Sequence, residues 1–396
     1  MFSENIKVLY IEPSVTRQIG GAQVFEKLLM ENLSSKFEFT VISSFYDFYT
    51  NIKDKRIIKI RLNKFSGILS SLLEKIYKLN NRKLVLVLSL IPFTLYLYEF
   101  SKFIKREWKN CNVIMSGDGY YQSELACLLA GVRDKPHMHI LNSAEPLRLR
   151  GIPFFNSWAI KFLGFYANFN RITFVALNES TKHEFEKLFP GRSTLIGIGV
   201  NTEEYKPVEF RLRKNNVLFM GRLDEKQKNV SLLIKAFALH MDKTYSLIIA
   251  GTGNDIEYYN NMISMFHLED RCKLLGYVSH EKSVELLSTS KIFVNTSIRE
   301  GQSNAVLEAM SCGCATVCVD NLGARATIKN YYNGIIIENS VEELIRVLDN
   351  LLDDDNLVMK LSQNARKTAV EKFSISKVSR LYEENLVGLI NDAHEA

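Results

Sequence analysis

Short apolar runs alternate with amphipathic segments along almost the whole chain. In the first half, these runs predict strands at 7–11, 39–43, 57–60, 113–116, 137–141, 173–177 and 195–198. Apolar residues at helical spacing lie between most of the runs, for example at 22–33, 123–130 and 180–189. Alternating strands and helices are typical of a parallel sheet that is covered by helices on both faces.

The alternation restarts after a polar stretch, 201–216, with strands predicted at 217–220, 246–250, 271–275, 292–295 and 315–319. A chain of 396 residues is too long for one ordinary hydrophobic core. We therefore predict an α/β protein with two Rossmann-like, doubly wound domains, 1–203 and 204–375, and a last helix, 376–396, that packs back on the first. Ligands of such sheets bind at the carboxyl ends of the strands, so two facing sheets would form a central cleft.

The composition is that of a globular protein, with 46% hydrophobic and 24% charged residues. Among the six cysteines only Cys312 and Cys314 are close in sequence, and without a second pair a zinc site is not expected. Free thiols fit a reducing cytoplasm. The segment 1–13 indicates a first strand and lacks the features of a signal peptide, so we expect a cytoplasmic protein.

Positive charge is concentrated in residues 51–110, which hold 14 Lys and Arg against four Asp and Glu, whereas the whole chain carries +6. An anionic membrane or nucleic acid would suit this region, and solvated helix faces explain it about as well. Within it, the apolar segment 84–98 is shorter than the roughly 20 residues that span a bilayer. It is either part of a core or a surface that contacts a membrane.

Glycines and cations follow several of the predicted strands. Gly20 and Gly21 precede the first helix, where the backbone can approach an anion, although a tight turn explains them equally well. Arg222 and Lys228 follow the strand 217–220 and could hold a diphosphate from two sides. As an arbitrary pair, they could equally be two surface charges.

Two glutamates distinguish the segment between the strands 292–295 and 315–319. Glu300 is expected in a loop beside a helix N-terminus, where an acid is favourable for the helix dipole alone. Glu308 lies within an apolar helix, between Leu307 and Ala309. A buried carboxylate needs hydrogen-bond donors or a polar ligand, so Glu308 is harder to explain by structure alone.

These segments together resemble family 4 of the retaining glycosyltransferases, which have the two-domain GT-B fold. The family's pattern Glu-x7-Glu-Ala-Met-x-x-Gly is matched from Glu300 to Gly313. The spacing from Arg222 to Lys228 is the same as in the family's Gly-Arg-Leu…Lys segment. The similarity is strong from about residue 173 to the end, through LIGIGVNTEEYKP, NYYNGIII and FSISKVSRLYEENL, and in the first domain it depends on IGGAQVFEKLLMENL.

The resemblance implies a nucleotide-sugar site with Glu308 on the ribose hydroxyls and Glu300 on the sugar hydroxyls. Arg222 and Lys228 would bind the diphosphate. The other residues implied near the donor are Gly20 and Gly21 from the first domain, the backbone of Gln302, Ser303 and Asn304, and, around the base, Gly251, Gly276 and Val278.

A histidine of the first domain contacts the donor sugar in this family. His137 and His139 are one residue apart and therefore on the same face of a strand. His139 is the favoured candidate because it is nearer the carboxyl end of the strand. For either residue, an ordinary histidine of a strand is about as good an explanation.

The implied reaction is transfer of a sugar from a UDP- or GDP-sugar to an acceptor hydroxyl, with retention and without a cofactor. Arg222 and Lys228 would replace a metal in stabilising the departing phosphate. The phosphate would take the acceptor proton, so Glu300 is a positioning group. An acceptor-binding first domain with a basic region suggests glycolipid, lipid-linked saccharide or polysaccharide synthesis at the cytoplasmic face of the membrane. A soluble saccharide or a protein hydroxyl is also possible.

The sequence departs from the family at two places. Gln302 and Ser303 replace a frequent Phe-Gly, and the segment 321–328 lacks a usual acidic residue. The first change could alter which sugar fits. Three other functions stay open: a non-catalytic GT-B partner subunit of another transferase, a nucleotide-sugar epimerase or hydrolase, and a nucleic-acid-binding protein, for which no recognition module is found.

Overall fold

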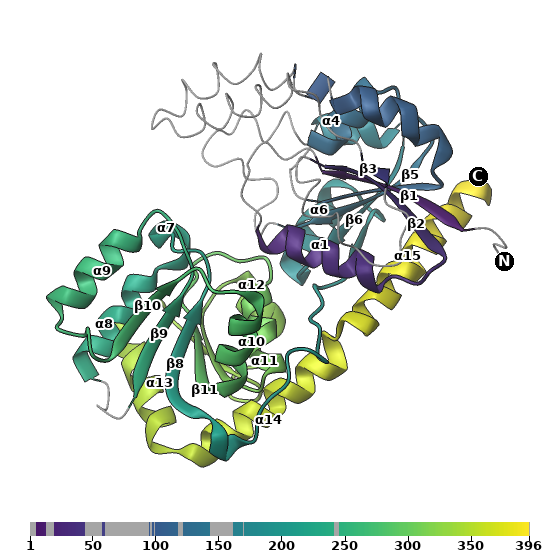
Figure 1. The fold of residues 1–396 in the computed structure, drawn as a ribbon. Coiled ribbons are helices and arrows are strands. Elements are labelled where there is room, and N and C mark those ends of the chain that lie inside the picture. Colours follow the sequence, from purple (N-terminus) through teal and green to yellow (C-terminus); the bar gives the residue numbers. More distant parts are fainter. Residues whose placement is uncertain are drawn as a thin grey trace. The chain divides into compact units, whose positions relative to one another are not determined.

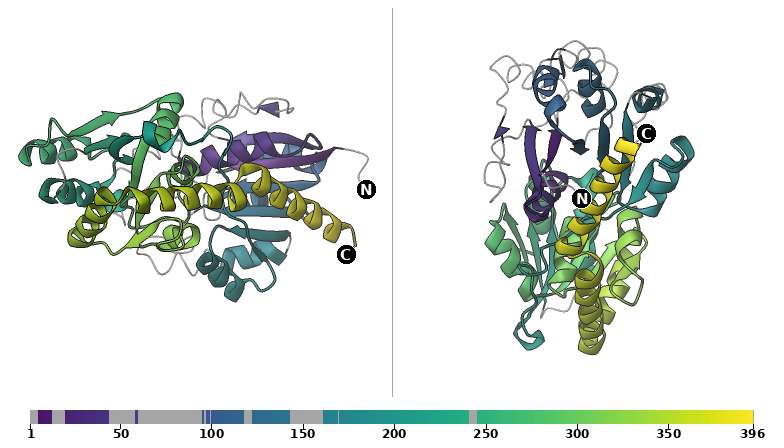
Figure 2. Two further views of the ribbon diagram at one scale, coloured as in Figure 1. Left: turned by 90° about the horizontal axis from the view of Figure 1, so that it is seen from below. Right: turned by 90° about the vertical axis from the view of Figure 1, so that its right-hand side faces the viewer.

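The chain divides into two compact units. One contains Met1–Ile196 with Ser379–Ala396, and the other contains Gly197–Val378. Each unit is built on a parallel sheet with helices packed against it (Figure 1, Figure 2). The computed structural model describes residues 5–12, 20–43, 58–59, 95, 97–98, 100–117, 122–142, 161–168, 170–240 and 245–395.

The described sheet of the first unit has seven parallel strands in the order β3-β2-β1-β4-β5-β6-β7. The chain runs outward from β1 to β3 and then crosses to the other side of β1, so the strand order reverses between β1 and β4. The strands are β1 (Ile6–Glu12), β2 (Phe37–Ser43), β3 (Ile58–Lys59), β4 (Val113–Gly117), β5 (Pro136–Leu141), β6 (Arg171–Ala176) and β7 (Ser193–Leu195).

Helices cover the central strands of this sheet, and every residue of β4 and β5 is buried. Burial of both faces is expected for a parallel sheet inside an α/β domain. The core joins side chains of the strands, such as Ile114 and Phe174, to helical side chains such as Phe185. The helices with described bounds are α1 (Gly21–Asn32), α4 (Gln122–Leu129), α6 (Glu179–Leu188) and α15 (Ile375–Glu395), with η2 (Trp108–Asn110) as a short 3-10 turn.

The sheet of the second unit has six parallel strands in the order β10-β9-β8-β11-β12-β13. Its order reverses between β8 and β11. The strands are β8 (Lys214–Met220), β9 (Ser246–Ala250), β10 (Cys272–Gly276), β11 (Ser290–Asn295), β12 (Ala315–Val319) and β13 (Ile335–Ile337). The sequence did not predict β13, because three residues at a sheet edge give too short an apolar run.

Polar caps explain where several helices of this unit begin. The Ser279 and Ser340 hydroxyls accept hydrogen bonds from the backbone N–H groups of Lys282 and Glu343, both at 3.2 Å. The helices are α7 (Glu225–Lys228), α8 (Val230–His240), α9 (Ile256–Met265), α10 (His280–Thr289), α11 (Asn304–Ser311), α12 (Leu322–Thr327), α13 (Val341–Asp353) and α14 (Asp355–Lys372), with η3 (Phe210–Leu212) ahead of β8.

The units divide earlier than the boundary predicted after residue 203, because the segment after Ile196 is bound to the second unit. Val200 forms a parallel bridge with Ser374. The Arg366 guanidinium donates to the carbonyls of Thr202 and Tyr205, at 3.0 and 2.9 Å. These bonds move the boundary to Ile196.

The last helix, α15, begins in the second unit and continues into the first. Within the first unit, Glu383 accepts a hydrogen bond from the Ser34 backbone N–H and lies 3.6 Å from the Lys36 ammonium. The Arg171 guanidinium donates to the Asp392 carbonyl. The predicted final helix 376–396 therefore corresponds to α15, which starts one residue earlier.

The predictions for the basic region can be compared with the structure only in part. Most of 51–110, including 84–94 of the apolar segment, lies outside the described residues. In the part that is described, no helix is both long and apolar enough to cross a membrane.

Candidate functional site

The reversal of strand order in the second sheet brings together the loops that follow β8 and β11. In doubly wound sheets, ligands bind at the carboxyl ends of the strands beside such a reversal. Arg222 and Lys228 follow β8, and Glu300 follows β11. Three of the residues predicted from sequence therefore lie at the position where this fold binds ligands.

Lys228 and Glu300 form an ion pair between these two loops, through Nζ and Oε1. Only 15% of the Lys228 side chain and 13% of the Glu300 side chain is exposed, so solvent screens the pair weakly. Hydrogen bonds tie the loops together, from the Thr296 hydroxyl to the Lys228 carbonyl at 2.6 Å and from Ile298 N–H to the Gln227 carbonyl at 2.9 Å. The ammonium and the carboxylate are thus held at fixed places.

The local structure explains why Lys228 lies at the end of a short helix. Asp224 caps the short helix α7 by accepting from Lys226 N–H at 3.1 Å, and Asn229 ends it with a left-handed φ of 49°. Lys228 is therefore the last residue of α7. A cation at the C-terminal end of a helix is electrostatically favourable.

Arg222 is exposed on the same loop, one residue before the buried Leu223. No ion pair or hydrogen bond of its side chain is found within the part of the chain that the structure describes. The Leu223 backbone N–H is bound to the Thr252 carbonyl at 2.9 Å, so the loop itself is anchored. The Arg222 guanidinium can therefore bind an anion without breaking an existing interaction. The Lys228 ammonium must first share or release the Glu300 carboxylate.

Glycines bring the ends of β8, β9 and β10 into close contact. Gly251 N–H donates to the Gly276 carbonyl at 2.8 Å, and Gly221 N–H donates to the Ala250 carbonyl at 3.0 Å. Gly251 has a φ of 145°, and a Cβ built on it would collide with the Gly221 carbonyl oxygen. Only glycine fits there. Gly276 also has a positive φ, 67°, but opens onto free space beside the half-buried Val278.

Gln302 has a role that the sequence did not reveal. Its side-chain oxygen accepts a hydrogen bond from Ile198 N–H at 2.7 Å. A Cβ on Gly197 would stand 2.8 Å from the same oxygen. The glutamine that departs from the family pattern therefore binds the segment after the domain boundary, and only its backbone remains for the predicted site.

Ser303 precedes α11, which begins at Asn304, and its φ of −108° and ψ of 120° are accessible to any residue. The serine that replaces the family's second glycine therefore causes no backbone strain. Its side chain makes no capping bond to α11 and instead accepts from the Asn295 amide at 3.3 Å. An uncapped helix start favours an anionic group.

Glu308 lies in the middle of α11 and is half-buried. Burial raises the pKa of Glu308 to about 7, against the opposing effects of a hydrogen bond from the Tyr205 hydroxyl and the charge of His280. The Tyr205 and His280 rings meet edge to face at 5.8 Å. The sequence did not identify these two neighbours, which come from other segments. A carboxylate with this pKa would gain from hydroxyl donors of a ligand.

The glycines predicted to approach a phosphate in the first unit lie at the start of α1, after β1, and so beside the reversal of that sheet. Gly20 is the N-cap residue, and its own N–H is already bound to the Gln23 side-chain oxygen at 2.9 Å. Gly21 is the first residue of α1 and is exposed. An anion at this helix start would therefore compete with Gln23 for the Gly20 N–H.

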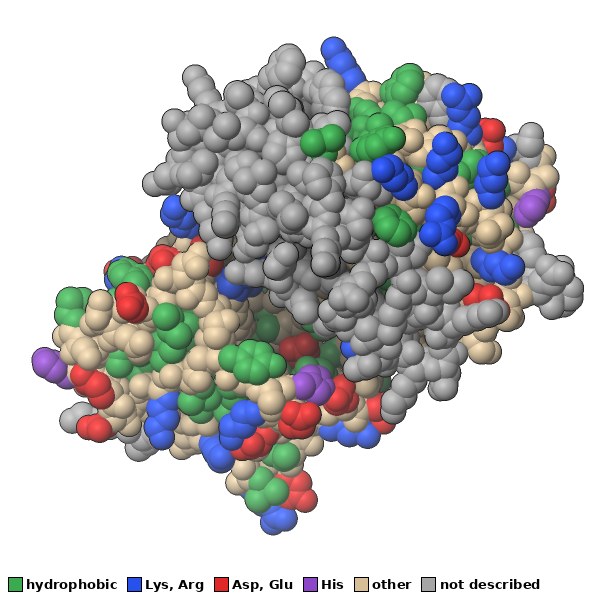
Figure 3. Space-filling model, turned by 45° about the horizontal axis from the view of Figure 1, so that its top comes forward, with side chains coloured by type: hydrophobic (Ala, Val, Ile, Leu, Met, Phe, Trp, Pro, Cys, Tyr) green, Lys and Arg blue, Asp and Glu red, His purple; other side chains and the backbone are tan. Residues whose placement is uncertain are grey.

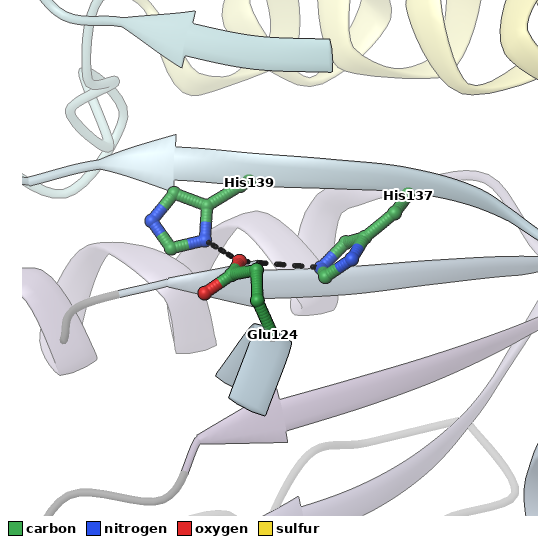
Figure 4. Close-up of side chains that lie close together, drawn as sticks. All are labelled: Glu124, His137 and His139. Carbon is green, nitrogen blue, oxygen red and sulfur yellow. Dashed lines mark ion pairs between the residues drawn. The ribbon is translucent and has the colours of Figure 1, made fainter. Parts of the chain in front are cut away.

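His137 and His139 lie on β5 and point toward Glu124 of α4, as Figure 4 shows. His139 Nδ1 is 2.6 Å from Glu124 Oε1, whereas His137 Nε2 is 3.9 Å away. All three side chains are buried. Burial, the largest single effect, acts to raise the pKa of Glu124, but the combined effects of His139, His137 and the backbone hold the pKa below its ordinary value. Burial lowers the pKa of His137 to about 4, so His137 is neutral.

This cluster has the composition of a metal site, with ligand atoms that all lie within 4.8 Å of one another. Two ligands of one zinc ion, each at roughly 2.1 Å, stand about 3.4 Å apart in tetrahedral geometry. The separation of His139 Nδ1 from Glu124 Oε1, 2.6 Å, is shorter than this. The Ser116 hydroxyl also lies 2.8 Å from His137 Nε2 and 2.9 Å from His139 Nδ1. The Ser116 hydroxyl thus bonds the two histidines, whereas both buried carboxylate oxygens of Glu124 are without a hydrogen-bond partner among the described residues.

Residues 200–368 match the family model described as glycosyl transferases group 1. This segment contains the ion pair, Glu308 and the glycines Gly221, Gly251 and Gly276.

Two similar curated proteins are named for the sugar that they transfer. The N-acetylgalactosamine-N,N'-diacetylbacillosaminyl-diphospho-undecaprenol 4-alpha-N-acetylgalactosaminyltransferase of Campylobacter jejuni is 31% identical over 174 residues, 43% of this chain and 46% of that protein. The UDP-Gal:alpha-D-GlcNAc-diphosphoundecaprenol alpha-1,3-galactosyltransferase of Escherichia coli is 29% identical over 207 residues, 48% of this chain and 52% of that protein. The chain thus spans about half the length of these relatives.

The fold resembles that of Anabaena HepE, solved in complex with UDP, with a TM-score of 0.73. The comparison covers 97% of this chain and 100% of HepE, at 16% identity, and so concerns the fold alone. Two doubly wound parallel sheets on one chain are the GT-B fold, and this prediction is confirmed.

The raised pKa of Glu308 predicts a pH-dependent stability. Between the ordinary value near 4.3 and about 7, the folded state keeps a proton that the unfolded state has lost. The contribution of Glu308 to the free energy of unfolding therefore falls as the pH rises through this window. Glutamine does not titrate, so the Glu308→Gln variant should not lose this stability. The difference in free energy of unfolding, variant minus natural protein, should therefore be larger at pH 8 than at pH 5 by on the order of 2 kcal/mol.

Urea unfolding at both pH values would measure this difference, with Glu338→Gln as the control because Glu338 is exposed. An equal difference between the Glu308→Gln variant and the natural protein at pH 5 and pH 8 would contradict the raised pKa.

The close contact of β8 and β9 predicts that Gly251→Ala is strongly destabilising. The methyl group collides with a backbone carbonyl that cannot move away, at a φ that alanine disfavours, so we expect a loss of about 2–4 kcal/mol. Gly388→Ala, in the interior of α15 with open space around it, should instead stabilise by up to about 1 kcal/mol. Thermal unfolding of both variants tests the contrast, and equal effects would refute it.

Proposed function

Residues 200–368 match the family model of the glycosyl transferases group 1, and on that premise we propose that this protein transfers a sugar from a nucleotide-diphosphate sugar to an acceptor hydroxyl. The observation that carries the proposal is the Lys228–Glu300 pair at the reversal of the second sheet. A cation and a carboxylate side by side at the ligand-binding edge of the fold support a site for a diphosphate and for sugar hydroxyls.

The diphosphate is assigned to Lys228 and Arg222. An arriving diphosphate competes with Glu300 for the Lys228 ammonium, and the released carboxylate then becomes free to accept hydrogen bonds from sugar hydroxyls. Binding of the donor thus exchanges one ion pair for another, so no buried charge is left unpaired. The exposed Arg222 adds a second positive charge from the same loop.

The remaining donor contacts are assigned by position around this pair. Glu308 accepts hydrogen bonds from the ribose hydroxyls, which would compensate for the energetic cost of its partial burial. Gly251, Gly276 and Val278 border the base, where the strand ends carry little side-chain bulk. The backbone of 302–304 and the start of α11 border the phosphate and the sugar. The base is uridine or guanosine, and the UDP bound to HepE, which shares the fold, supports uridine.

In the proposed reaction, the bond between the anomeric carbon and the phosphate oxygen breaks, and a bond to the acceptor oxygen forms on the same face. The leaving phosphate oxygen takes the acceptor proton. Arg222 and Lys228 stabilise the negative charge that develops on this phosphate, without a metal ion. Glu300 holds the sugar and forms no covalent bond in this scheme.

The acceptor is proposed to be a lipid-linked saccharide at the cytoplasmic face of a membrane. The two relatives named above act on diphospho-undecaprenol substrates, which supports this class. Figure 3 shows Lys and Arg side chains beside exposed hydrophobic ones on one face. The described end of the basic region exposes Lys102, Lys105, Arg106 and Lys109, and Tyr98 is 51% exposed with the Lys102 ammonium 4.8 Å from its ring centre.

Donor binding should raise the melting temperature. At about 100 times its dissociation constant, the right nucleotide sugar should add roughly 2.7 kcal/mol to the free energy of unfolding. A panel of UDP-, GDP- and ADP-sugars measured by thermal unfolding would identify it. Lys228→Ala should abolish the shift and slow transfer by about a hundredfold or more, because the diphosphate loses its principal cation.

Lys226→Ala is the matched control, since Lys226 lies on the same helix α7 but is exposed. It should keep both the thermal shift and the rate. A thermal shift that survives in the Lys228→Ala variant would contradict the diphosphate assignment. No shift for any nucleotide sugar would favour a non-catalytic partner subunit.

Membrane association should be electrostatic if the basic end of 51–110 is involved. Vesicles that contain phosphatidylglycerol should co-sediment the protein at low salt and release it at about 0.5 M salt, where charges are screened. The double substitution Lys102→Glu and Lys105→Glu should weaken binding. Lys367→Glu, an exposed lysine of the second unit, should not. Equal binding to neutral vesicles would refute the electrostatic mechanism.

A further inference from the structure

Three buried side chains of the first unit, Glu124, His137 and His139, are not used in the reaction proposed above. Glu124 comes from α4 and both histidines come from β5, and their ligand atoms all lie within 4.8 Å of one another. Glu124 and His137 have none of their surface exposed. Burying a carboxylate is costly unless charged or hydrogen-bonded partners compensate for the lost water.

The Glu124 carboxylate lacks such hydrogen bonds. Neither Oε1 nor Oε2 has a hydrogen-bond partner among the residues that the structure describes. His139 Nδ1 is 2.6 Å from Oε1 without satisfying it. Figure 4 shows a nitrogen of each histidine ring pointing at this same carboxylate oxygen. Three groups that can each offer a lone pair therefore converge on one point, which favours a cation there.

The outer hydrogen bond of His137 favours the same arrangement. His137 Nδ1 lies 2.9 Å from the oxygen of the buried Tyr166, which can accept the Nδ1 proton. The two rings also meet edge to face at 5.7 Å, and this contact holds the orientation of the imidazole. A proton on Nδ1 leaves Nε2, the nitrogen that faces Glu124, with a lone pair. A metal-binding histidine typically donates its other ring N–H in this way.

The separations of the ligand atoms suit a small divalent ion. His137 Nε2 and His139 Nδ1 stand 3.9 and 2.6 Å from Glu124 Oε1, on either side of the roughly 3.4 Å between two ligands of tetrahedral zinc. A small rotation of the Glu124 side chain equalises these separations, and both carboxylate oxygens are available to the ion. Two imidazole ligands favour zinc over magnesium or calcium, which prefer oxygen.

We propose that Glu124, His137 and His139 bind one Zn²⁺ ion that fastens α4 to β5 within the first unit. The buried surroundings are those of a structural site, since a catalytic zinc keeps a position open for substrate. The ion compensates for the charge of the Glu124 carboxylate and stabilises the unit. The cysteine spacing did not indicate this site, because none of its ligands is a cysteine. The inference is independent of the proposed function.

The test measures zinc content and zinc-dependent stability of the full chain, purified without a histidine tag. After dialysis against EDTA, the natural protein titrated with zinc chloride should bind one ion per chain, with a dissociation constant of about a micromolar or lower. Its melting temperature should rise on binding. Glu124→Gln and His137→Gln should each weaken zinc binding by about a hundredfold or more, because each removes a ligand. Co²⁺ in place of zinc should give the visible absorption of a tetrahedral site.

The competing explanation is an ion pair between Glu124 and a protonated His139, without a metal. An ion pair predicts that Glu124→Gln lowers the melting temperature by the same amount in EDTA and in zinc. The zinc site predicts that this variant loses only the stability that zinc provides. In EDTA it should be at least as stable as the natural protein, because it removes a buried charge without hydrogen bonds. An equal loss in both conditions would overturn the proposal.

His183→Gln is the matched control, since His183 is an exposed histidine on α6 of the same unit. It should keep both the bound ion and the rise in melting temperature. Tyr166→Phe removes only the outer partner of His137 and should weaken zinc binding about tenfold.

Three outcomes of the titration would count against the site. Absence of zinc binding by the natural protein would overturn the proposal. So would an ion that stays bound with unchanged affinity in both Glu124→Gln and His137→Gln, because it would then lie elsewhere. Binding of Mn²⁺ or Fe²⁺ in preference to Zn²⁺ would overturn the assignment of zinc.

Discussion

The pairing of β8 with β11 is the constraint on which the second unit depends. These strands are far apart in the chain, at Lys214–Met220 and Ser290–Asn295, yet they are neighbours because the sheet reverses its order between them. The reversal leaves the loops after both strands side by side, and only there can Lys228 meet Glu300. The glycine contacts of β8 with β9 and the hydrogen bonds between the two loops keep that arrangement rigid.

Both units contain partly or fully buried carboxylates, and these carboxylates differ in the groups that surround them. Glu300 is paired with the Lys228 ammonium, and Glu124 lies 2.6 Å from His139 Nδ1. For Glu308, the Tyr205 hydroxyl and the charge of His280 do not outweigh the effect of burial, and its pKa rises to about 7. In a low-dielectric surrounding, the partner of each acid decides its protonation state.

The candidate residues could be predicted because strand ends and charged residues are visible in the sequence. Arg222, Lys228 and Glu300 each follow an apolar run, and the fold class alone says that such positions bind ligands. Two features could not be predicted. The side chain of Gln302 binds Ile198, and Glu124 lies beside His139, each with a partner that no spacing rule connects to it.

The sequence by itself determined the two doubly wound sheets, because the alternation of apolar runs and amphipathic segments is local and each run must be buried. It also determined which residues follow the strands. Only the tertiary structure decided that the first unit ends at Ile196, since this depends on Arg366 and Ser374, which lie far along the chain near its other end. The tertiary structure also decided which acidic side chain pairs with which basic one. Contacts between distant segments depend on strand order and register and not on local pattern.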